Sequence, residues 1–390
     1  MAQKAQAAEA GLLRVLHIVV NMNRGGAETL LMNLYRNTDR RIVQFDFLTC
    51  KEGVFDDEIR ELGGRIHRIP YVSEAGHSGY VKALQAFYAT HPEYKVVHSH
   101  LDKMSGLPLS VAHKFEIPVR IAHSHNTQSE GGTLARLYKW IVGTRITPHA
   151  THMLACSQAA AKWLFTSKSE QAVILPNGID VEQFTYRADI RREVRSELGL
   201  PEGTFVIGHV GRFAQQKNHG FLLELFSRFH DQVADSVLVL VGVGPLQEEM
   251  QKRVEASGLA DHVRFLGARS DVARLLQGMD TFVFPSLHEG LGIVIIEAQA
   301  AGLPCLISDS IPQEADLGFG FVEALPLTTS AKWMEKLILL VTEDRSRIVS
   351  AGDIADKGYD IKQTAKQIQD FYVTVSVGGA KDEKTDRIHS

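Results

Sequence analysis

The sequence predicts an α/β protein built from two domains, each containing a parallel sheet. Short apolar runs such as RVLHIVV (14–20) alternate with runs of helical spacing such as AETLLMNLYRNT (27–38). This alternation is typical of βαβ units. The turn-rich stretch ILPNGID (174–180) interrupts the pattern, which starts afresh with FVIGHVGR (205–212). A length of 390 residues also fits two domains.

Further strand-like runs occur in both halves, separated by helical patterns. In the first half they are VQFDFLTC (43–50), RIHRIP (65–70), VVHSH (96–100), VRIAHSH (119–125) and HMLACS (152–157). In the second half they are SVLVLVGVG (236–244), HVRFLG (262–267), DTFVFPS (280–286) and LPCLIS (303–308). We expect the domains to join near 176–190, and the polar tail over 378–390 to be disordered.

The composition is that of a soluble protein, with 44% hydrophobic residues, 23% charged residues and a net charge of −4. No apolar run is long enough to cross a bilayer, and MAQKAQAAEA lacks the apolar core of a signal peptide. Cys50, Cys156 and Cys305 form no CxxC pair, which indicates reduced thiols in a cytoplasmic protein. The sequence has no basic cluster interleaved with aromatic residues, which is the pattern typical of nucleic-acid binding. The oligomeric state cannot be inferred.

The residues that follow the strands carry the functional information, because parallel sheets bind ligands beyond the carboxyl ends of their strands. Gly25 and Gly26 precede a helix, where the backbone can approach a ligand and free N–H groups can bind an anion. A tight turn without a ligand is the alternative. Arg212 and Lys217 flank a short loop and could clamp a diphosphate. A solvated basic loop fits them equally well.

The stretch SLHEGLGIVIIEAQ (286–299) places one glutamate before a predicted helix and another one to two turns inside it. The helix N-terminus, with Gly290 and Gly292, can bind phosphate. Glu297 can accept both hydroxyls of a ribose diol, and Glu289 can reach the hydroxyls of a sugar. The alternatives are a helix cap for Glu289 and an exposed helical position for Glu297. Apolar neighbours favour burial of Glu297.

Taken together, these motifs resemble glycosyltransferase family 4, the retaining, nucleotide-sugar-dependent transferases of the GT-B fold. The resemblance covers roughly residues 14–375 and rests on NRGGAE (23–28), LPNGID (175–180), VGRFAQQKN (210–218), VGVGPL (241–246), VRFLGARSDV (263–272) and FPSLHEGLGIVIIEAQAAGLP (284–304). Within the family, IAHSHNT (121–127) is similar to bacterial exopolysaccharide or capsule transferases.

The resemblance implies two Rossmann-like domains that face a central cleft. Residues 1–185 would form the acceptor-binding domain, and 186–360 the domain that binds the nucleotide sugar. A C-terminal helix over 361–377 would cross back to the first domain, leaving 378–390 as the tail.

The family also implies roles for particular residues. Arg212 and Lys217 would neutralise the donor diphosphate, which Gly26, beside Gly25, would meet from the other domain. Glu297 would bind the ribose and Glu289 the transferred sugar.

Backbone groups would complete the donor site. Gly292 and Ile293 would donate N–H groups at the helix start, next to the loop residues Gly290 and Leu291. The segment that would hold the base is Phe265, Leu266 and Gly267.

Two HxH pairs end neighbouring predicted strands, at His98 and His100 and at His123 and His125, and alternation places each pair on one face. The family has a catalytic histidine near the anomeric carbon at the second position. We assign this role to His125, with His123 as the alternative. Four imidazoles could instead hold a metal. No carboxylate completes the matching strand-end positions, Asp102 being the closest, so no metal site is predicted.

The expected activity is transfer of a sugar from a UDP-sugar to a hydroxyl of a glycan or lipid-linked acceptor, with retention, in bacterial cell-surface glycan synthesis. The chain contains no Asp-x-Asp pair, so we expect neither a metal nor another cofactor. The alternatives are a sugar-nucleotide epimerase and a non-catalytic nucleotide-binding module. The helical run LARLYKWIVGTR (134–145) would face either its own core or a membrane surface, the latter placing the protein on the inner face of the membrane.

Overall fold

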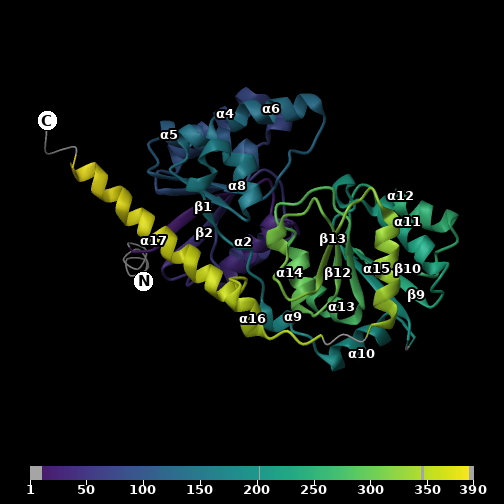
Figure 1. The fold of residues 1–390 in the computed structure, drawn as a ribbon. Coiled ribbons are helices and arrows are strands. Elements are labelled where there is room, and N and C mark those ends of the chain that lie inside the picture. The colour runs from purple at the N-terminus through teal and green to yellow at the C-terminus, as the bar shows by residue number, and fades with distance from the viewer. Residues whose placement is uncertain (1–10, 202, 344–346, 386–390) are drawn as a thin grey trace. The chain divides into compact units, whose positions relative to one another are not determined.

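Two α/β units make up the computed structural model, which describes residues 11–201, 203–343 and 347–385 (Figure 1). Unit 1 comprises residues up to 179 together with those from 358 onward, and unit 2 comprises 180–357. The predicted boundaries at 185/186 and 360/361 are therefore displaced. Helix α9 (Val181–Phe184) explains the first displacement, because it packs on helices of unit 2.

Unit 1 contains a parallel sheet of seven strands in the order β3-β2-β1-β4-β5-β6-β7. These strands are β1 (Leu13–Ile18), β2 (Val43–Thr49), β3 (Ile66–Arg68), β4 (Val96–Ser99), β5 (Val119–Ser124), β6 (His152–Ala155) and β7 (Val173–Ile174). The helical segments of unit 1 are α2 (Gly26–Asn37), α3 (Asp56–Glu61), α4 (Val72–Thr90), η1 (Asp102–Ser105), α5 (Gly106–Lys114), α6 (Thr133–Gly143), α7 (Ile146–His149), α8 (Gln158–Phe165), η2 (Thr166–Gln171) and α17 (Ile361–Thr385).

Unit 2 contains a parallel sheet of six strands in the order β10-β9-β8-β11-β12-β13. These strands are β8 (Phe205–Val210), β9 (Ser236–Val241), β10 (Val263–Phe265), β11 (Thr281–Phe284), β12 (Cys305–Ser308) and β13 (Val322–Leu325). The helical segments besides α9 are α10 (Ala188–Glu197), η3 (Gln215–Lys217), α11 (His219–His230), α12 (Gln247–Ala256), α13 (Val272–Gly278), α14 (Ile293–Ala300), η4 (Gln313–Ala315), α15 (Ser330–Thr342) and α16 (Ala351–Asp356).

Each sheet reverses its strand order once. In unit 1 the chain lays β2 and β3 on one side of β1 and then begins the other side with β4. In unit 2 the same reversal falls between β8 and β11. Loops that leave such a pair of strands diverge and open a crevice at their carboxyl ends, where doubly wound folds bind ligands.

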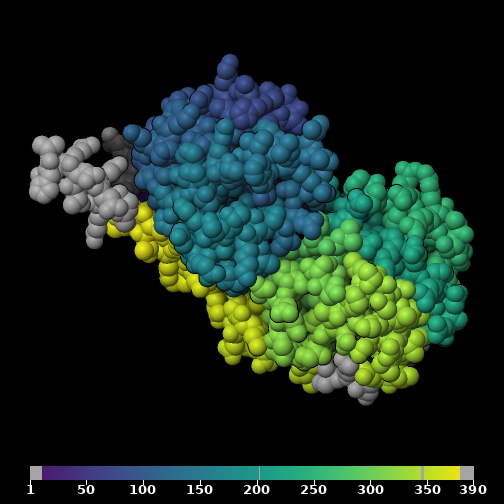
Figure 2. Space-filling model, turned by 45° about the horizontal axis from the view of Figure 1, so that its top comes forward, coloured from purple at the N-terminus to yellow at the C-terminus, as the bar shows by residue number. Residues whose placement is uncertain are grey.

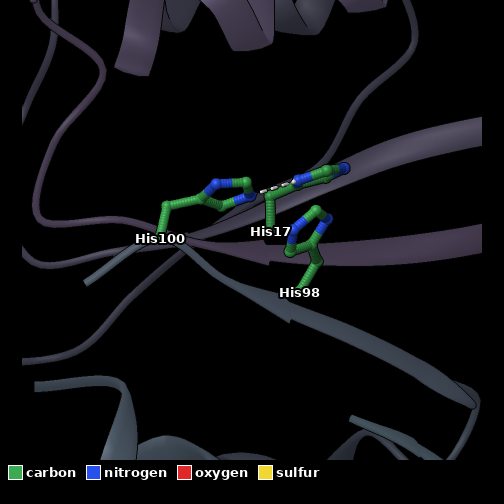
Figure 3. Close-up of side chains that lie close together, drawn as sticks. All are labelled: His17, His98 and His100. Carbon is green, nitrogen blue, oxygen red and sulfur yellow. Dashed lines mark hydrogen bonds between the residues drawn. The ribbon is translucent and has the colours of Figure 1, made fainter. Parts of the chain in front are cut away.

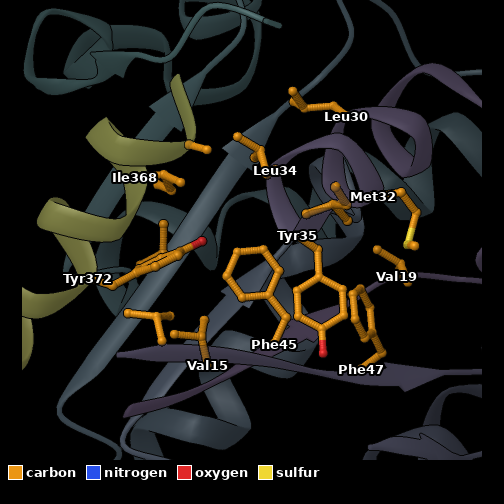
Figure 4. Packing of buried hydrophobic residues seen from close by; sticks show 14 of the residues in the cluster. Val15, Val19, Leu30, Met32, Leu34, Tyr35, Phe45, Phe47, Ile368 and Tyr372 are labelled. Carbon is orange, nitrogen blue, oxygen red and sulfur yellow. The ribbon is translucent and has the colours of Figure 1, made fainter. Parts of the chain in front are cut away.

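The C-terminal helix α17 belongs to the core of unit 1. Tyr372 and Ile368 are buried against a cluster that includes Tyr35 and Phe45, as Figure 4 shows. A Cβ on Gly178 would lie 2.7 Å from the Cα of Ile361, so the returning chain needs a glycine there. The helix predicted over 361–377 thus packs on the N-terminal unit.

The helix also extends further than the sequence indicated. It appears as the yellow band beside unit 1 in Figure 2 and continues to Thr385. The tail predicted to be disordered from residue 378 is therefore helical as far as Thr385, and residues 386–390 lie outside the described part of the chain.

Candidate active site

Lys217 and Glu289 meet at the point where the sheet of unit 2 reverses its order. Lys217 ends η3, after β8, and Glu289 lies in the loop after β11. The Lys217 Nζ is 2.6 Å from the Glu289 Oε1, and the side chains are 16% and 9% exposed. The same Nζ lies 4.7 Å from the ring centroid of Phe284. A lysine so enclosed can interact strongly with an anion, because little water screens it.

The two loops that carry this ion pair are also joined by hydrogen bonds. The backbone N–H of Leu287 donates to the carbonyl of Gln216 at 2.8 Å. The side-chain amide of Gln216 donates back to the carbonyl of His288 at 2.8 Å. These two hydrogen bonds fix the loops relative to each other, and with them the positions of Lys217 and Glu289.

Helix α14 begins immediately after this loop. Gly292 is its N-cap, with a left-handed φ of 82°, and has no side chain of its own to cap the helix. The first two amides of α14, those of Ile293 and Val294, have no carbonyl of their own helix to bond, whereas the Ile295 N–H donates to the Gly292 carbonyl at 2.8 Å. Such free groups bind phosphate at other helix starts.

Glu297 lies in the second turn of α14 and is partly buried. Its carboxylate has no hydrogen-bond or ion-pair partner among the residues described. Burial raises the pKa of Glu297 to about 7. A carboxylate kept from water without a protein partner is suited to accepting the hydroxyls of a bound ligand.

The other residues predicted to bind the donor are Arg212 and the segment from Phe265 to Gly267. Arg212 lies in the loop after β8, and its exposed guanidinium makes no ion pair with the described residues. In the predicted base-binding segment, the Leu266 N–H donates to Leu240 and the Gly267 carbonyl accepts from Gly242. The Leu266 N–H is therefore taken up at the end of the sheet, whereas the Gly267 carbonyl keeps a second lone pair, so base binding by Phe265, Leu266 and Gly267 stays a prediction.

Unit 1 has a cavity of about 320 Å³ at its own reversal point. Its walls come mainly from the segments that follow β1, β4, β5 and β6, and they include Glu28, His100, Asp102, Lys139 and Trp163. The cavity therefore offers both charge signs and an aromatic face.

Gly25 and Gly26 stand at the edge of this region, where α2 begins. Gly25 is the N-cap, in an extended conformation, and Gly26 is the first helical residue. A Cβ on Gly26 would meet no atom within 4 Å, whereas one on Gly25 would lie 2.3 Å from the Glu28 carboxylate. Nothing within unit 1 requires a glycine at Gly26, which weakens the interpretation of this residue as part of a tight turn.

Five histidines gather on one face of the unit 1 sheet. They are His17, His98, His100, His123 and His125. The parallel register sets His17 opposite His98, and alternation places the second member of each HxH pair on the same face. Figure 3 shows three of them, with the bond between His17 and His100.

Hydrogen bonds join the five rings into two rows. In the first, His17 Nδ1 is 3.0 Å from His100 Nε2, and His100 Nδ1 is 2.8 Å from His125 Nε2. In the second, His98 Nε2 is 3.2 Å from His123 Nδ1, and His98 Nδ1 is 2.6 Å from the Tyr372 hydroxyl.

All five rings are held neutral. Burial lowers the pKa of His17 to about 3 and that of His125 to about 4. It also lowers the pKa of His98, His100 and His123 well below the usual value. Each neutral ring has one donor and one acceptor nitrogen, which is what a row of imidazoles requires.

Of the two candidate catalytic histidines, His125 is the more accessible. It lies just past the end of β5 and is partly buried, whereas His123 is fully buried within the strand. The His125 backbone N–H donates to the Asp102 Oδ1 at 2.9 Å. Asp102 has a left-handed φ of 47°, and burial raises its pKa to about 6. The sequence analysis assigned Asp102 no role, although its position right after VVHSH was a usable signal.

Helix α6 buries Val142 in unit 1 but leaves four of its apolar side chains exposed. Leu134, Leu137, Trp140 and Ile141 are 83%, 53%, 58% and 49% exposed, so the interpretation that 134–145 faces its own core is wrong for these residues. Arg136 and Arg145 are also exposed. Among the residues described, no helix combines the length and hydropathy needed to cross a membrane.

Comparison with known proteins identifies the family of the chain. The family described as "Glycosyl transferase 4-like domain" matches residues 25–178, and "Glycosyl transferases group 1" matches 190–317. The chain is 37% identical over 368 residues to the putative glycosyltransferase EpsF of Bacillus subtilis, covering 92% of this chain and 96% of that protein. It is 29% identical to the Escherichia coli enzyme UDP-Gal:alpha-D-GlcNAc-diphosphoundecaprenol alpha-1,3-galactosyltransferase, covering 73% and 76% of the two chains.

A solved structure shows the same fold. Anabaena HepE in complex with UDP and glucose matches with a TM-score of 0.69 at 20% identity, covering 95% of this chain and 99% of that one. Two parallel-sheet α/β units of this kind define the GT-B class of glycosyltransferase. The chain belongs to glycosyltransferase family 4.

Proposed function

We propose that this glycosyltransferase transfers a sugar from a UDP-sugar to a hydroxyl of a glycan or lipid-linked acceptor, with retention, in bacterial exopolysaccharide, capsule or other cell-surface glycan synthesis. The E. coli relative is named for a UDP-galactose donor and a diphosphoundecaprenol acceptor, and HepE was solved with UDP and glucose. Both support a UDP-linked donor for this chain.

The observation that carries the proposal is the convergence of Lys217, Glu289 and the start of α14 beyond β8 and β11. A diphosphate placed there meets an enclosed ammonium and the first helical amides. Both favour the negative charge that develops on the leaving nucleoside diphosphate. Arg212, exposed on the same loop as Lys217, adds a flexible guanidinium. The transfer then needs no metal on the diphosphate.

The carboxylates give the donor its orientation. Glu297, unpaired in the second turn of α14, accepts the two ribose hydroxyls. Glu289, held by its bond to Lys217, lies beside the transferred sugar. These two contacts set the direction of the nucleotide along α14.

His125 serves the reaction as a hydrogen-bonding group. The acceptor hydroxyl attacks from the face that the diphosphate leaves, and the diphosphate takes its proton. Because burial lowers the pKa of His125 to about 4, the ring remains neutral at pH 7 and is a weak base. Its role is to orient the sugar near the anomeric carbon.

Helix α6 provides attachment to the inner face of the cell membrane. Four exposed apolar side chains lie on it, with Arg136 and Arg145 beside them. An amphipathic helix of this kind lies in the interface of an anionic bilayer. This attachment would bring the enzyme to a lipid-linked acceptor.

A donor panel tests the proposal. The purified protein is incubated with UDP- and GDP-sugars, with and without chelator, and released nucleoside diphosphate and sugar products are measured. We expect slow hydrolysis of one UDP-sugar that the chelator does not abolish, and no epimerised donor. If no donor is hydrolysed and no nucleotide raises the melting temperature, the proposal is wrong.

A further inference from the structure

The histidines at the ends of β4 and β5 form a site whose ligand is not explained by sugar transfer. One ligand atom from each of His100, His123 and His125 lies within 4.8 Å of the other two. We propose that these three imidazoles bind a divalent transition-metal ion of the Zn²⁺ class beside the unit 1 cavity.

The sheet itself prearranges the three ligands. The register of β4 on β5 places His100 level with His123, and His125 follows two residues later on the same face. His100 Nδ1 and His125 Nε2 are 2.8 Å apart. Two nitrogens bound at about 2.0–2.1 Å to a tetrahedral ion are about 3.3 Å apart, so small ring rotations suffice.

The other two histidines act as outer partners. His17 Nδ1 can accept the proton of His100 Nε2, which leaves His100 Nδ1 for the metal. His98 Nε2 can accept the proton of His123 Nδ1, which leaves His123 Nε2 for the metal. Outer partners of this kind fix the tautomer of metal-bound histidines.

Of the nitrogens left for the metal, His123 Nε2 is the one that lacks a hydrogen-bond partner among the described residues. His123 Nε2 and His125 Nδ1 are buried without a hydrogen bond within the described residues. A buried polar atom in this state costs about 1–3 kcal/mol, and a native structure rarely keeps several together without a reason. Coordination at His123 Nε2 removes one of these costs directly.

The cavity supplies access and negative charge. His100 lines it together with Glu28, Asp102 and Glu130, and water from the cavity completes the coordination. No metal site was predicted from the sequence, because no carboxylate matches the strand-end positions. Asp102 nevertheless lies next to His125, bonded to its backbone N–H. The deeper group of His17, His98 and His100 is fully buried and is the poorer candidate.

The ion belongs to unit 1 and has no part in holding the diphosphate in unit 2. Binding therefore does not rest on the proposed function. Because the ion occupies His125, bound metal would slow a reaction in which this ring orients the sugar.

The test is metal binding to chelator-treated protein. The parent protein of this test and all its variants carry His262→Ala. The His230 and His262 rings are only 4.0 Å apart and could otherwise compete for the metal. Zn²⁺ is titrated against a chromophoric chelator, and Co²⁺ is followed by its visible absorption. We expect one equivalent of Zn²⁺ and the strong visible bands of a tetrahedral Co²⁺ site.

Loss of one ligand should weaken binding about 100-fold. His123→Ala and the more accessible His125→Ala should both do so, while the exposed His113→Ala should not; melting curves establish that each variant folds. Equal binding in all variants, or no Co²⁺ bands in the parent, contradicts the proposal. A protein that binds Zn²⁺ but transfers no sugar would instead count against the proposed function alone.

Discussion

The sheets of both units reverse their strand order once, but different side chains stand beside the two reversal points. In unit 2 the reversal between β8 and β11 holds the charged pair of Lys217 and Glu289. In unit 1 the reversal between β1 and β4 lies beside five neutral imidazoles. Sheet order therefore decides where a ligand can bind, and the side chains that follow the strands decide which charge it can carry.

Acid should destabilise unit 1 more than unit 2, because burial lowers the pKa of five clustered histidines in unit 1 but only of His209 and His219 in the core of unit 2. For each cluster histidine the folded pKa lies below the unfolded value of 6.5, so its stabilising contribution is present above pH 6.5. It is lost as the pH falls below 6.5, down to about 4 for His125 and about 3 for His17. Each ring contributes a slope of about 1.4 kcal/mol per pH unit there. Hydrogen exchange measured at pH 7 and pH 5 should show β4 and β5 losing protection well before β8 and β11.

Lys217→Met removes the ammonium group that is proposed to neutralise the donor diphosphate in unit 2. We expect kcat/KM to fall about 10²–10³-fold, as when a preorganised group that stabilises the transition state is lost. Stability should also fall, because the Glu289 carboxylate loses its partner. Lys252→Met is the matched control, since its ion pair to Glu248 is exposed.

The double variant Lys217→Met/Glu289→Gln separates the two effects. It should recover stability without recovering activity. A fall of less than threefold in Lys217→Met would contradict the assignment of the diphosphate to this lysine.

Glu297→Gln should remove a pH dependence of both the stability of unit 2 and its affinity for UDP. Glu297 has a folded pKa of about 7 against 4.5 unfolded, so its stabilising contribution is lost as the pH rises from 4.5 through 7. The variant should thus melt higher than the parent at pH 8. In the parent, UDP should bind up to about tenfold more tightly at pH 8 than at pH 6, as the carboxylate ionises. Calorimetry on the control variant Glu249→Gln, at an exposed glutamate, should show the same pH dependence of UDP affinity as the parent. If Glu297→Gln keeps that pH dependence as well, the ribose contact is refuted.

Gly26→Ala tests whether unit 1 also approaches the donor. The new methyl group meets no atom within 4 Å, so the melting temperature should stay the same or rise slightly. If the diphosphate lies against Gly26, donor affinity should fall about tenfold, since a contact of this kind is worth about 1.4 kcal/mol. Gly132→Ala, at the equally open N-cap of α6, is the control. Unchanged donor affinity would confine the donor to unit 2.

Helix α6 should give the smallest effect. Leu137→Ser with Trp140→Ser removes two exposed apolar side chains and should reduce binding to anionic vesicles by up to about tenfold. Vesicle co-sedimentation measures this. Leu339→Ser, at an exposed leucine of α15 in unit 2, should bind as the parent does. Equal sedimentation of both variants would argue against membrane attachment through α6.

Local patterns in the sequence were sufficient for most of the fold. The alternation of strand and helix periods predicted the two parallel sheets, because a buried strand and an amphipathic helix each impose their own spacing. The strands missed were β7 and β13, both at sheet edges. β7 has only two residues, and the middle residues of β13 are exposed, so neither shows an apolar run.

The sequence by itself also determined which residue types follow the strands, including Lys217, Glu289 and both HxH pairs. Only the tertiary structure decided which of them meet. The Lys217 contact to Glu289 spans 72 positions, and the Tyr372 contact to His98 spans 274. Sequence spacing reports the period and burial of one element, whereas these contacts depend on strand order and on the return of α17 to unit 1. The neutral state of the five histidines follows from the same packing, because burial, and not residue type, sets their pKa values.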